Sequence, residues 1–318
     1  MKKLFLGIDT SNYTSSFALI DEVGTVLEDV RIMLSVKNGQ KGLRQSDAVF
    51  QHIQNLEKIS TALKKYDKNN LQAIAASITP RSVEDSYMPV FTVSKNIGLL
   101  LASVLNVPYY KTTHQLGHIR NAMAFSNVDV QKPFIAIHFS GGTSEVLSVH
   151  VENRVIIEKI IGKTLDITAG QLIDRIGVLT GLAFPSGRHM EQFAYRGEQD
   201  PIPTTYYFKE GNVSYSGVET ALKKIFQEGN YPVPVIYDNL FHNIAVSLEK
   251  LIHYHCQMQE IYQVLLFGGV LANEIVKKYL MQKFSGSSIQ LFFCNKVYSS
   301  DNAVGVSYIA KDYYGENE

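Results

Sequence analysis

Two stretches of the chain share one pattern of apolar runs and polar turns. Residues 4–33 predict a strand, a polar turn, a second strand, a tight turn at residues 22–24 and a third strand, and residues 134–161 predict the same succession. A shift of 129 residues superimposes the stretches and matches Ile8 with Ile137, Ser11 with Ser140, Thr14 with Thr143, Ser15 with Ser144, and Val26 with Val155. The sequence therefore predicts a strand-turn-strand module that is used twice. The alternative is a chance match, since β-branched residues recur in all strands.

Regular patterns also fill the rest of the chain. Apolar residues spaced by three and four predict helices over 45–66, 86–106, 166–180, 188–196, 216–227, 237–256 and 301–313, and one that begins at Ala272. Short apolar runs predict strands over 72–79, 107–112, 262–269 and 288–294. Because strands alternate with helices, we expect an α/β protein with mixed sheets, in which two similar lobes face each other across a cleft.

The length of the chain also favours two lobes. Its 318 residues exceed the size at which single hydrophobic cores usually stop growing. We expect an N-terminal lobe over 1–112, to which the C-terminal helix 301–313 crosses back. The C-terminal lobe, over 113–300, is expected to carry the metal and nucleotide sites.

Charge and cysteine content narrow the function further. Thirty basic and thirty acidic residues give a formal charge of zero, so any RNA contact must be local or shared with a partner. Cys256 and Cys294 are too few for a disulfide framework and suit a reducing compartment. The first apolar run is broken by Asp9 before it reaches the length of a signal-peptide core, and no stretch of about 18 uncharged apolar residues could span a membrane. We therefore expect a cytoplasmic protein that does not contact a membrane.

A pair of histidines stands four residues apart in "KTTHQLGHIRNAMA", at the predicted start of a helix. His114 and His118 would lie on one helical face, so that both imidazoles could bind one cation. The same spacing also occurs in histidine pairs that are packed or solvated. The pair alone does not decide between these readings.

The turn of the second module, "HFSGGTSEV", has the composition of an anion-binding loop. Gly141 and Gly142 allow backbone N–H groups to approach an anion, and Ser140 and Thr143 add hydroxyl donors. The first module offers Asp9, Thr10, Ser11 and Thr14 at the equivalent turn. Paired turns of this kind would hold a polyphosphate from two sides, whereas the simpler alternative is that Gly-Gly only forms a turn.

Two later segments could complete a nucleotide site. In 166–191, Asp174 and Glu191 could accept hydrogen bonds from a ribose diol and Gly187 could let a sugar or base approach the backbone. The alternative is that both carboxylates lie on solvated helix faces. In "LLFGGVLANEIV", a strand that ends at Gly268 and Gly269 leads into a helix. The N–H groups at such a helix N-terminus favour ligand oxygens, but the same strand–glycine–helix junction is also common in proteins as a purely structural feature.

A further carboxylate could join the histidine pair. Asp301 begins the last predicted helix, which Ser299 or Ser300 could cap, and it either serves at the helix N-terminus or binds a metal. The 129-residue shift places His138 opposite Asp9, at the end of a strand. His114, His118 and Asp301, with or without His138, would form a set that suits zinc or iron.

These segments and their order resemble the TsaD family, the tRNA threonylcarbamoyladenosine transferases once labelled O-sialoglycoprotein endopeptidases. Seven ordered blocks carry the resemblance: "GIDTSNYTSSFALID", "HQLGH", "FSGGTSEV", "TLDITAGQLIDRIGVLTGLAFPSG", "VSYSGVETALKK", "GGVLAN" and "SSDNAVGVSYIA". The resemblance implies the fold of actin, sugar kinases and heat-shock chaperones (the ASKHA fold).

The resemblance also implies a set of site residues. The family's metal ligands fall on His114, His118 and Asp301, and His138 falls where some members place a Tyr near the metal. Its nucleotide contacts fall on Ser140, Gly141, Gly142, Thr143, Asp174, Gly187, Glu191 and Asn273. The family moves a threonylcarbamoyl group from its adenylate to an adenosine amine beside the tRNA anticodon. The implied cofactors are one divalent metal and ATP or an acyl-adenylate, and the implied partners are tRNA, TsaB- or TsaE-like proteins and a second copy of the chain.

The chain departs from the family at three places near the expected site. The family's first turn usually reads T-S-C-D-E-T, whereas Asn12, Tyr13 and Thr14 follow Ser11 here. The family's GPG loop is replaced by "SITPRSVEDSYMP", and the His of its S-G-G-H-T motif is Thr143. These changes suit a paralogue that keeps metal and nucleotide but acts on another acceptor.

We therefore expect a metal- and adenine-nucleotide-dependent carbamoyl-type transferase, with tRNA adenosine as the default acceptor. One alternative is a TsaB-like partner without activity, although such a protein would not need the metal residues. Another is a sugar-type kinase that uses Asp9. A metallopeptidase is least expected, because H-E-x-x-H peptidases use the Glu as base and Gln115 stands at that position.

Overall fold

The computed structural model describes residues 2–11, 13–36, 43–83, 86–195, 202, 204 and 206–315. Asn12 of the first turn, Glu84 and Asp85 of the segment that replaces the GPG loop, and Arg196 at the end of a predicted helix lie outside the described residues. The chain forms two compact units. The first unit comprises 1–125, 152–156 and 300–318, and the second comprises 126–151 and 157–299. The lobe boundaries expected from the sequence stay a prediction.

The first unit is built on a mixed five-stranded sheet. Its strands are β1 (Leu4–Ser11), β2 (Thr14–Asp21), β3 (Val26–Met33), β4 (Leu71–Thr79) and β5 (Tyr109–Thr113). Their order is β3-β2-β1-β4-β5, in which β1, β2 and β3 form an antiparallel meander and β4 and β5 run parallel to β1.

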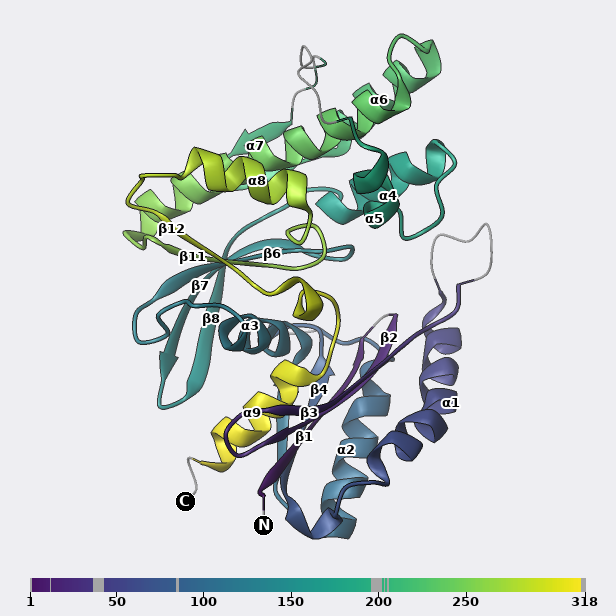
Figure 1. The fold of residues 1–318 in the computed structure, drawn as a ribbon, viewed down its shortest axis with the longest axis vertical. Helices are drawn as coiled ribbons and strands as arrows, with labels where there is room; N and C mark the ends of the chain where they lie inside the picture. The colour runs from purple at the N-terminus through teal and green to yellow at the C-terminus, as the bar shows by residue number, and fades with distance from the viewer. Residues whose placement is uncertain are drawn as a thin grey trace. The chain divides into compact units, whose positions relative to one another are not determined.

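Two pairs of helices cover the faces of this sheet (Figure 1). The pairs are α1 (Gln45–Leu63) with α2 (Phe91–Leu105), and α3 (His114–Ala124) with α9 (Val304–Tyr314). Successive side chains of β1 lie on opposite faces of the sheet, because side chains alternate in direction along a strand. Leu4, Leu6 and Ile8 join the core with α1 and α2, whereas Phe5 packs with Val306 of α9.

Helices α3 and α9 approach each other closely at glycines. A Cβ placed on Gly305 would lie 1.8 Å from the backbone oxygen of Gly117 and 2.7 Å from the backbone nitrogen of Asn121. No side chain fits at that distance, so glycine at 305 permits the contact. This contact holds the segment before α9 beside the first turn of α3.

The second unit repeats the sheet topology of the first. Its strands are β6 (Phe134–Phe139), β7 (Ser144–Glu152), β8 (Val155–Lys163), β11 (Gln263–Phe267) and β12 (Gln290–Phe293). Their order is β12-β11-β6-β7-β8, so a meander of β6, β7 and β8 is again extended by two parallel strands. The predicted α/β class with mixed sheets is therefore confirmed, and the repeated topology agrees with the predicted module repeat.

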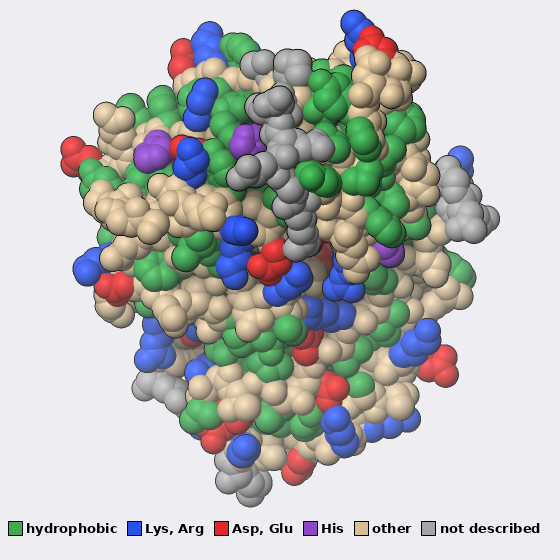
Figure 2. All heavy atoms as spheres, turned by 45° about the horizontal axis from the view of Figure 1, so that its top comes forward, with side chains coloured by type: hydrophobic (Ala, Val, Ile, Leu, Met, Phe, Trp, Pro, Cys, Tyr) green, Lys and Arg blue, Asp and Glu red, His purple; other side chains and the backbone are tan. Residues whose placement is uncertain are grey.

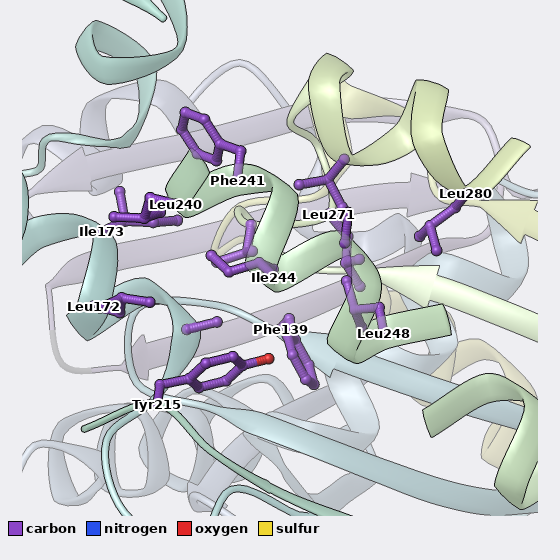
Figure 3. Packing of buried hydrophobic residues seen from close by; sticks show 14 of the residues in the cluster. Phe139, Leu172, Ile173, Tyr215, Leu240, Phe241, Ile244, Leu248, Leu271 and Leu280 are labelled. Carbon is purple, nitrogen blue, oxygen red and sulfur yellow. The ribbon is translucent and has the colours of Figure 1, made fainter. Parts of the chain in front are cut away.

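The core of the second unit forms around a long helix. Its helices are α4 (Ala169–Leu179), α5 (Gly187–Phe193), α6 (Ser216–Glu228), α7 (Val233–Gln259) and α8 (Glu274–Lys283). Leu240, Ile244 and Leu248 of α7 pack with Phe139 of β6 and Leu280 of α8 in one buried cluster (Figure 3). Phe139 is the last residue of β6, so this packing anchors the strand end from which the loop to β7 begins.

Most predicted elements are confirmed, and their ends differ by a few residues. The helix predicted from residue 86 begins at Phe91, and the helix predicted from residue 301 begins at Val304. The short hairpin of β9 (Tyr207–Lys209) and β10 (Asn212–Ser214) was not predicted, nor were the 3-10 turns Lys68–Asn70 and Lys296–Tyr298. No helix in the described parts of the chain is both long and apolar enough to cross a membrane.

Candidate metal centre and glycine loops

The two histidines lie at the start of α3, as the sequence predicts. The Thr113 hydroxyl accepts a hydrogen bond from the Leu116 N–H (3.1 Å) and caps the helix, so α3 begins at His114. His118 follows one turn later, and its Nε2 lies 3.1 Å from Nε2 of His114. The side chain of His114 is 19% exposed and that of His118 is 5% exposed. The local helix start thus brings two imidazole nitrogens together.

Asp301 completes this group from a distant part of the chain. Its Oδ1 lies 3.3 Å from His118 Nε2 and 3.8 Å from His114 Nε2, and its Oδ2 accepts a hydrogen bond from the Ser11 hydroxyl (3.2 Å). The capping alternative for Asp301 is wrong, because Asn302 Oδ1 accepts the hydrogen bond from the Val304 N–H (2.9 Å) at the start of α9. The carboxylate of Asp301 is instead directed at the histidines.

Asp9 lies behind His114 and orients its ring. Its Oδ2 is 2.9 Å from His114 Nδ1 and accepts a hydrogen bond from the Ser77 hydroxyl (2.5 Å), and its Oδ1 accepts from the Ser11 N–H (2.9 Å). Burial lowers the pKa of His114, but the charge and hydrogen bond of Asp9 and the charge of Asp301 outweigh it and raise the pKa to about 9. When Nδ1 donates to Asp9, Nε2 remains as the ligand atom.

The chemistry of these residues fits a divalent cation. One ligand atom from each of His114, His118 and Asp301 lies within 4.8 Å of the other two. Two imidazole nitrogens and a carboxylate oxygen suit zinc or iron, and a carboxylate behind a ligating histidine is the usual outer partner of such a site. Asp301 is 34% exposed, so the group can be reached from solvent. These three residues form a candidate metal site.

Some expected residues take other places. Asp9 and Ser11, expected to contact a nucleotide, contact the metal group, and their nucleotide role stays a prediction. Sequence reasoning missed Ser77, because only the pairing of β1 with β4 brings it to Asp9. His138 lies on β6 in the second unit and stacks on Phe267 with ring centroids 4.8 Å apart. Its role as a fourth ligand stays a prediction.

The loop between β6 and β7 is shaped by its own hydrogen bonds. The Ser140 N–H donates to the Thr143 carbonyl (2.7 Å), and the Thr143 N–H donates to the Ser140 hydroxyl (3.2 Å). The Thr168 hydroxyl, at the start of α4, donates to the Gly141 carbonyl (2.8 Å). Gly141 and Gly142 are exposed, and a Cβ on either would meet nothing within 4 Å. Packing within the protein therefore does not require glycine here, which leaves room for a ligand.

A second glycine loop lies at the same edge of the sheet. Strands β6 and β11 are parallel, with His138 opposite Phe267, so the loops that follow them are neighbours. Gly268 has φ +106°, and a Cβ there would lie 2.3 Å from the Phe139 carbonyl oxygen, so both conformation and space require glycine. Asn273 caps α8 by accepting hydrogen bonds from two backbone N–H groups at 3.0 Å.

The predicted acidic residues tie the neighbouring helices together. Asp174 accepts a hydrogen bond from the Ser186 N–H (2.7 Å), and burial raises the pKa of its carboxyl group although this hydrogen bond opposes the rise. Glu191 accepts from the Glu274 N–H (2.8 Å) at the start of α8. Gly187 begins α5. The predicted nucleotide residues 140–143, 174, 187, 191, 268, 269 and 273 all belong to the second unit, and their ligand role stays a prediction.

Comparison with known proteins identifies the family. The sequence profile described as "TsaD: tRNA N6-adenosine threonylcarbamoyltransferase" matches residues 31–308. The tRNA N6-adenosine threonylcarbamoyltransferase of Neorickettsia sennetsu is 25% identical over 320 residues, which cover 96% of this chain and 92% of that protein. The one from Archaeoglobus fulgidus is 26% identical over 307 residues, which cover 95% of this chain and 89% of that protein.

Solved structures agree on the fold. Full-length HypF in its phosphate- and nucleotide-bound form matches with a TM-score of 0.62 at 14% identity; the match covers 100% of this chain and 56% of HypF, so the chain spans about half of HypF. Component A of (R)-2-hydroxyglutaryl-CoA dehydratase from Acidaminococcus fermentans matches with a TM-score of 0.58 at 13% identity, over 98% of this chain and 99% of that one. A glucokinase of the ROK family from Streptomyces griseus matches with a TM-score of 0.55 at 10% identity, over 97% of this chain and 99% of that one.

The predicted fold of actin, sugar kinases and heat-shock chaperones is thus confirmed. The family profile covers most of the chain, and the relatives match it over nearly its full length. The chain is a distant member of the TsaD family of tRNA N6-adenosine threonylcarbamoyltransferases.

Proposed function

We propose that this chain is a metal- and adenine-nucleotide-dependent carbamoyl-type transferase, with an adenosine of tRNA as its acceptor. The observation that carries the proposal is the group of His114, His118 and Asp301, with Asp9 behind it, in a chain that belongs to a family of threonylcarbamoyltransferases. A protein that served only as a scaffold would not need two imidazoles and a carboxylate arranged in this way.

The residues of the first unit would hold and orient the cation. His114 and His118 present Nε2, and Asp301 presents Oδ1. Asp9 fixes the ring of His114 by its hydrogen bond to Nδ1. The bound cation would polarise the carbamoyl-adenylate and stabilise charge on its acyl and phosphate oxygens as the acceptor amine attacks.

The residues of the second unit would bind the nucleotide. Backbone N–H groups of the exposed loop 140–143 and of residues 268–269 suit phosphate oxygens, because glycine lets the anion approach the main chain. Asp174 and Glu191 would accept hydrogen bonds from the ribose diol. The tRNA contact would be local, since Lys and Arg side chains lie beside Asp and Glu side chains across the face in Figure 2.

Two other functions fit the contacts less well. A sugar-type kinase would need Asp9 at its substrate, whereas Asp9 is 2% exposed and is bonded to Ser11, Ser77 and His114. A peptidase of the H-E-x-x-H type would need a carboxylate base after the first histidine, whereas Gln115 is buried there and cannot take up a proton.

One second candidate is favoured by particular residues, namely transfer to a different acceptor. Both acids of the family's first turn are missing, and Thr143 replaces a histidine in the glycine loop. The proposed metal residues and the proposed nucleotide residues other than Thr143 persist, so the changes would act on the acceptor or its position.

Complementation distinguishes the two acceptors. A strain depleted of its own tRNA threonylcarbamoyl transferase receives this chain, and the modified nucleoside in its tRNA is quantified. Restored modification, absent with the His114→Ala and His118→Ala double variant, is the expected result. Lack of modification with a folded, metal-loaded chain would overturn tRNA as the acceptor and favour the second candidate.

A further inference from the structure

A buried polar cluster joins α1 to the start of β2. The side chains of His52 and Ser15 are both fully buried, and His52 Nδ1 lies 2.7 Å from Ser15 Oγ. The side-chain amide of Asn55, one helical turn further on, donates a hydrogen bond to the same Ser15 oxygen (3.0 Å). The interface around it is apolar, since Ile59 of α1 and Phe17 of β2 belong to one buried hydrophobic cluster. A buried, satisfied polar link in an apolar interface fixes one arrangement of its partners.

Burial sets the charge of the histidine ring. The Ser15 hydroxyl can donate to His52 Nδ1 while its oxygen accepts the hydrogen bond from Asn55, and in that arrangement the ring proton is on Nε2. Burial lowers the pKa of His52 to about 4, although the charge of Asp9 and the Ser11 carbonyl oppose this, so the ring is neutral. Nε2 makes no hydrogen bond of ordinary geometry in the described part of the chain, but the Ser11 carbonyl is close enough to interact with it.

This cluster and the metal group use opposite faces of the first sheet. Ser15 points to the face that α1 covers, whereas Asp9 points to His114 of α3 on the other face. The link between the faces is the end of the β1–β2 hairpin. Ser15 pairs with Thr10, and Ser11 pairs with Thr14.

Ser11 connects the hairpin end to one proposed metal ligand, Asp301, and to Asp9, which orients another. Its hydroxyl donates to Asp301 Oδ2 (3.2 Å), and its N–H donates to Asp9 Oδ1 (2.9 Å). A shift of the hairpin end would therefore move one proposed ligand and the residue that orients another. Residues outside the metal site must therefore hold this end of the hairpin in place.

We propose that His52 is a positioning residue for the metal group: it anchors the β1–β2 end through Ser15 and so keeps the Ser11 hydroxyl at Asp301. His52 does not touch the cation or a substrate. The inference rests on the proposed metal site and is independent of the acceptor.

A double-mutant cycle on cobalt affinity tests the inference. The full chain is stripped with a chelator and titrated with Co²⁺ as wild type, His52→Ala, Ser11→Ala and the double variant. Each single change is expected to raise the Kd for Co²⁺ about 10-fold, as loss of outer-shell partners does. The double variant is expected to match Ser11→Ala, since both changes break one path. A loss of about 100-fold in the double variant, or an unchanged Kd in His52→Ala, would overturn the inference.

Two further variants separate positioning from general instability. His255 is also buried, with its Nε2 2.9 Å from the Gly211 carbonyl oxygen in the second unit, and His255→Ala should leave the Kd unchanged even where it lowers the unfolding midpoint. If His52→Ala does not fold, Ser15→Ala removes the same link by one oxygen atom and takes its place in the cycle. Failure of the wild type to bind Co²⁺ would overturn the proposed metal site, whereas wild-type binding with an unchanged Kd in the variants would overturn only the role of His52.

Discussion

The two strand-turn-strand modules share a topology but differ at the turns. In the first, Ser11 and Thr14 pair across a short turn, and the Leu34 N–H donates to the Tyr13 carbonyl (2.8 Å). In the second, loop 140–143 is longer, and its two glycines are exposed. At the first turn, the Ser11 hydroxyl donates a hydrogen bond to Asp301 of the candidate metal site. In loop 140–143, which we call the open loop, a Cβ on either glycine would meet nothing within 4 Å.

The strand ends show the same difference. Asp9, near the end of β1, forms hydrogen bonds with His114, Ser77 and Ser11. His138, 129 residues later, stacks on Phe267. One frame can thus support two different sites, because the sheet fixes where a strand ends and the side chains there decide the chemistry.

The largest effect is expected from Gly305→Ala, which breaks the contact between α9 and α3. The candidate metal site depends on this contact, whereas the open loop does not. The Cβ added by Gly305→Ala would overlap the Gly117 backbone oxygen, so the free energy of unfolding should fall by about 3 kcal/mol and metal should be lost. Denaturant unfolding and metal analysis measure both. Gly142→Ala is the matched control in the open loop and should change the free energy by less than about 0.5 kcal/mol. Equal losses in the two variants would contradict the comparison.

As the pH falls, the β1–β2 turn is expected to lose stability at a higher pH than loop 140–143. The pKa of His52 is about 4 in the fold, whereas an unfolded histidine has a pKa near 6.5, so the unfolded chain alone takes up a proton between these values. The contribution of His52 to the free energy of unfolding is therefore constant above about pH 6.5 and falls below it, by about 3 kcal/mol at pH 4. The second turn is held by the Thr168 hydroxyl, which does not titrate in this range.

Hydrogen exchange against pH measures this difference. Backbone protection of residues 13–17 should drop between pH 6.5 and 4, while that of 139–145 changes less. The slope should flatten in His52→Asn, which keeps an acceptor for Ser15 but cannot take up the proton. An unaltered slope in this variant would show that another group is responsible.

A smaller effect separates Asp9 from its counterpart His138. Asp9→Ala should weaken metal binding by about 10- to 100-fold, because the ring of His114 loses its partner at Nδ1. Metal affinity is measured by competition with a chelator. His138→Ala is the matched change in the second module, and a comparable loss there would make His138 a fourth ligand. No change with Asp9→Ala would contradict its orienting role.

The smallest effect on ligand affinity is expected for a change in the second unit, which contains the open loop. Asp174→Ala should weaken ATP binding about 10-fold in calorimetry, by loss of a hydrogen bond to a charged group, and should leave metal content unchanged. Asp166→Ala is the control, since Asp166 accepts hydrogen bonds from the N–H groups of Tyr215 and Ser216 at the start of α6. Unaltered ATP affinity in Asp174→Ala would remove that residue from the proposed site.

Local patterns were enough to predict most of the fold. Apolar runs between polar turns located both meanders, and apolar residues spaced by three and four located the helices, because burial of one helix face imposes that spacing. The β9–β10 hairpin was missed, since three-residue strands are too short for a pattern to show. Helix ends depended on caps: Asn302, not Asp301, provides the side-chain oxygen at the start of α9.

Site prediction from sequence was limited by long-range contacts. His114 and His118 could be paired by helical spacing, but Asp301 joins them through the contact between α3 and α9 at Gly305. Asp9 was assigned to a phosphate turn from its place after β1, whereas its hydrogen bonds depend on β4 and α3. No local signal in the sequence specifies such contacts.

Metal content of the purified chain tests the central claim most directly. Elemental analysis should find close to one zinc or iron per chain, and none after His114→Ala with His118→Ala in protein that keeps its wild-type circular dichroism. Absence of metal from the wild type, or the same metal content in the double variant, would contradict the account.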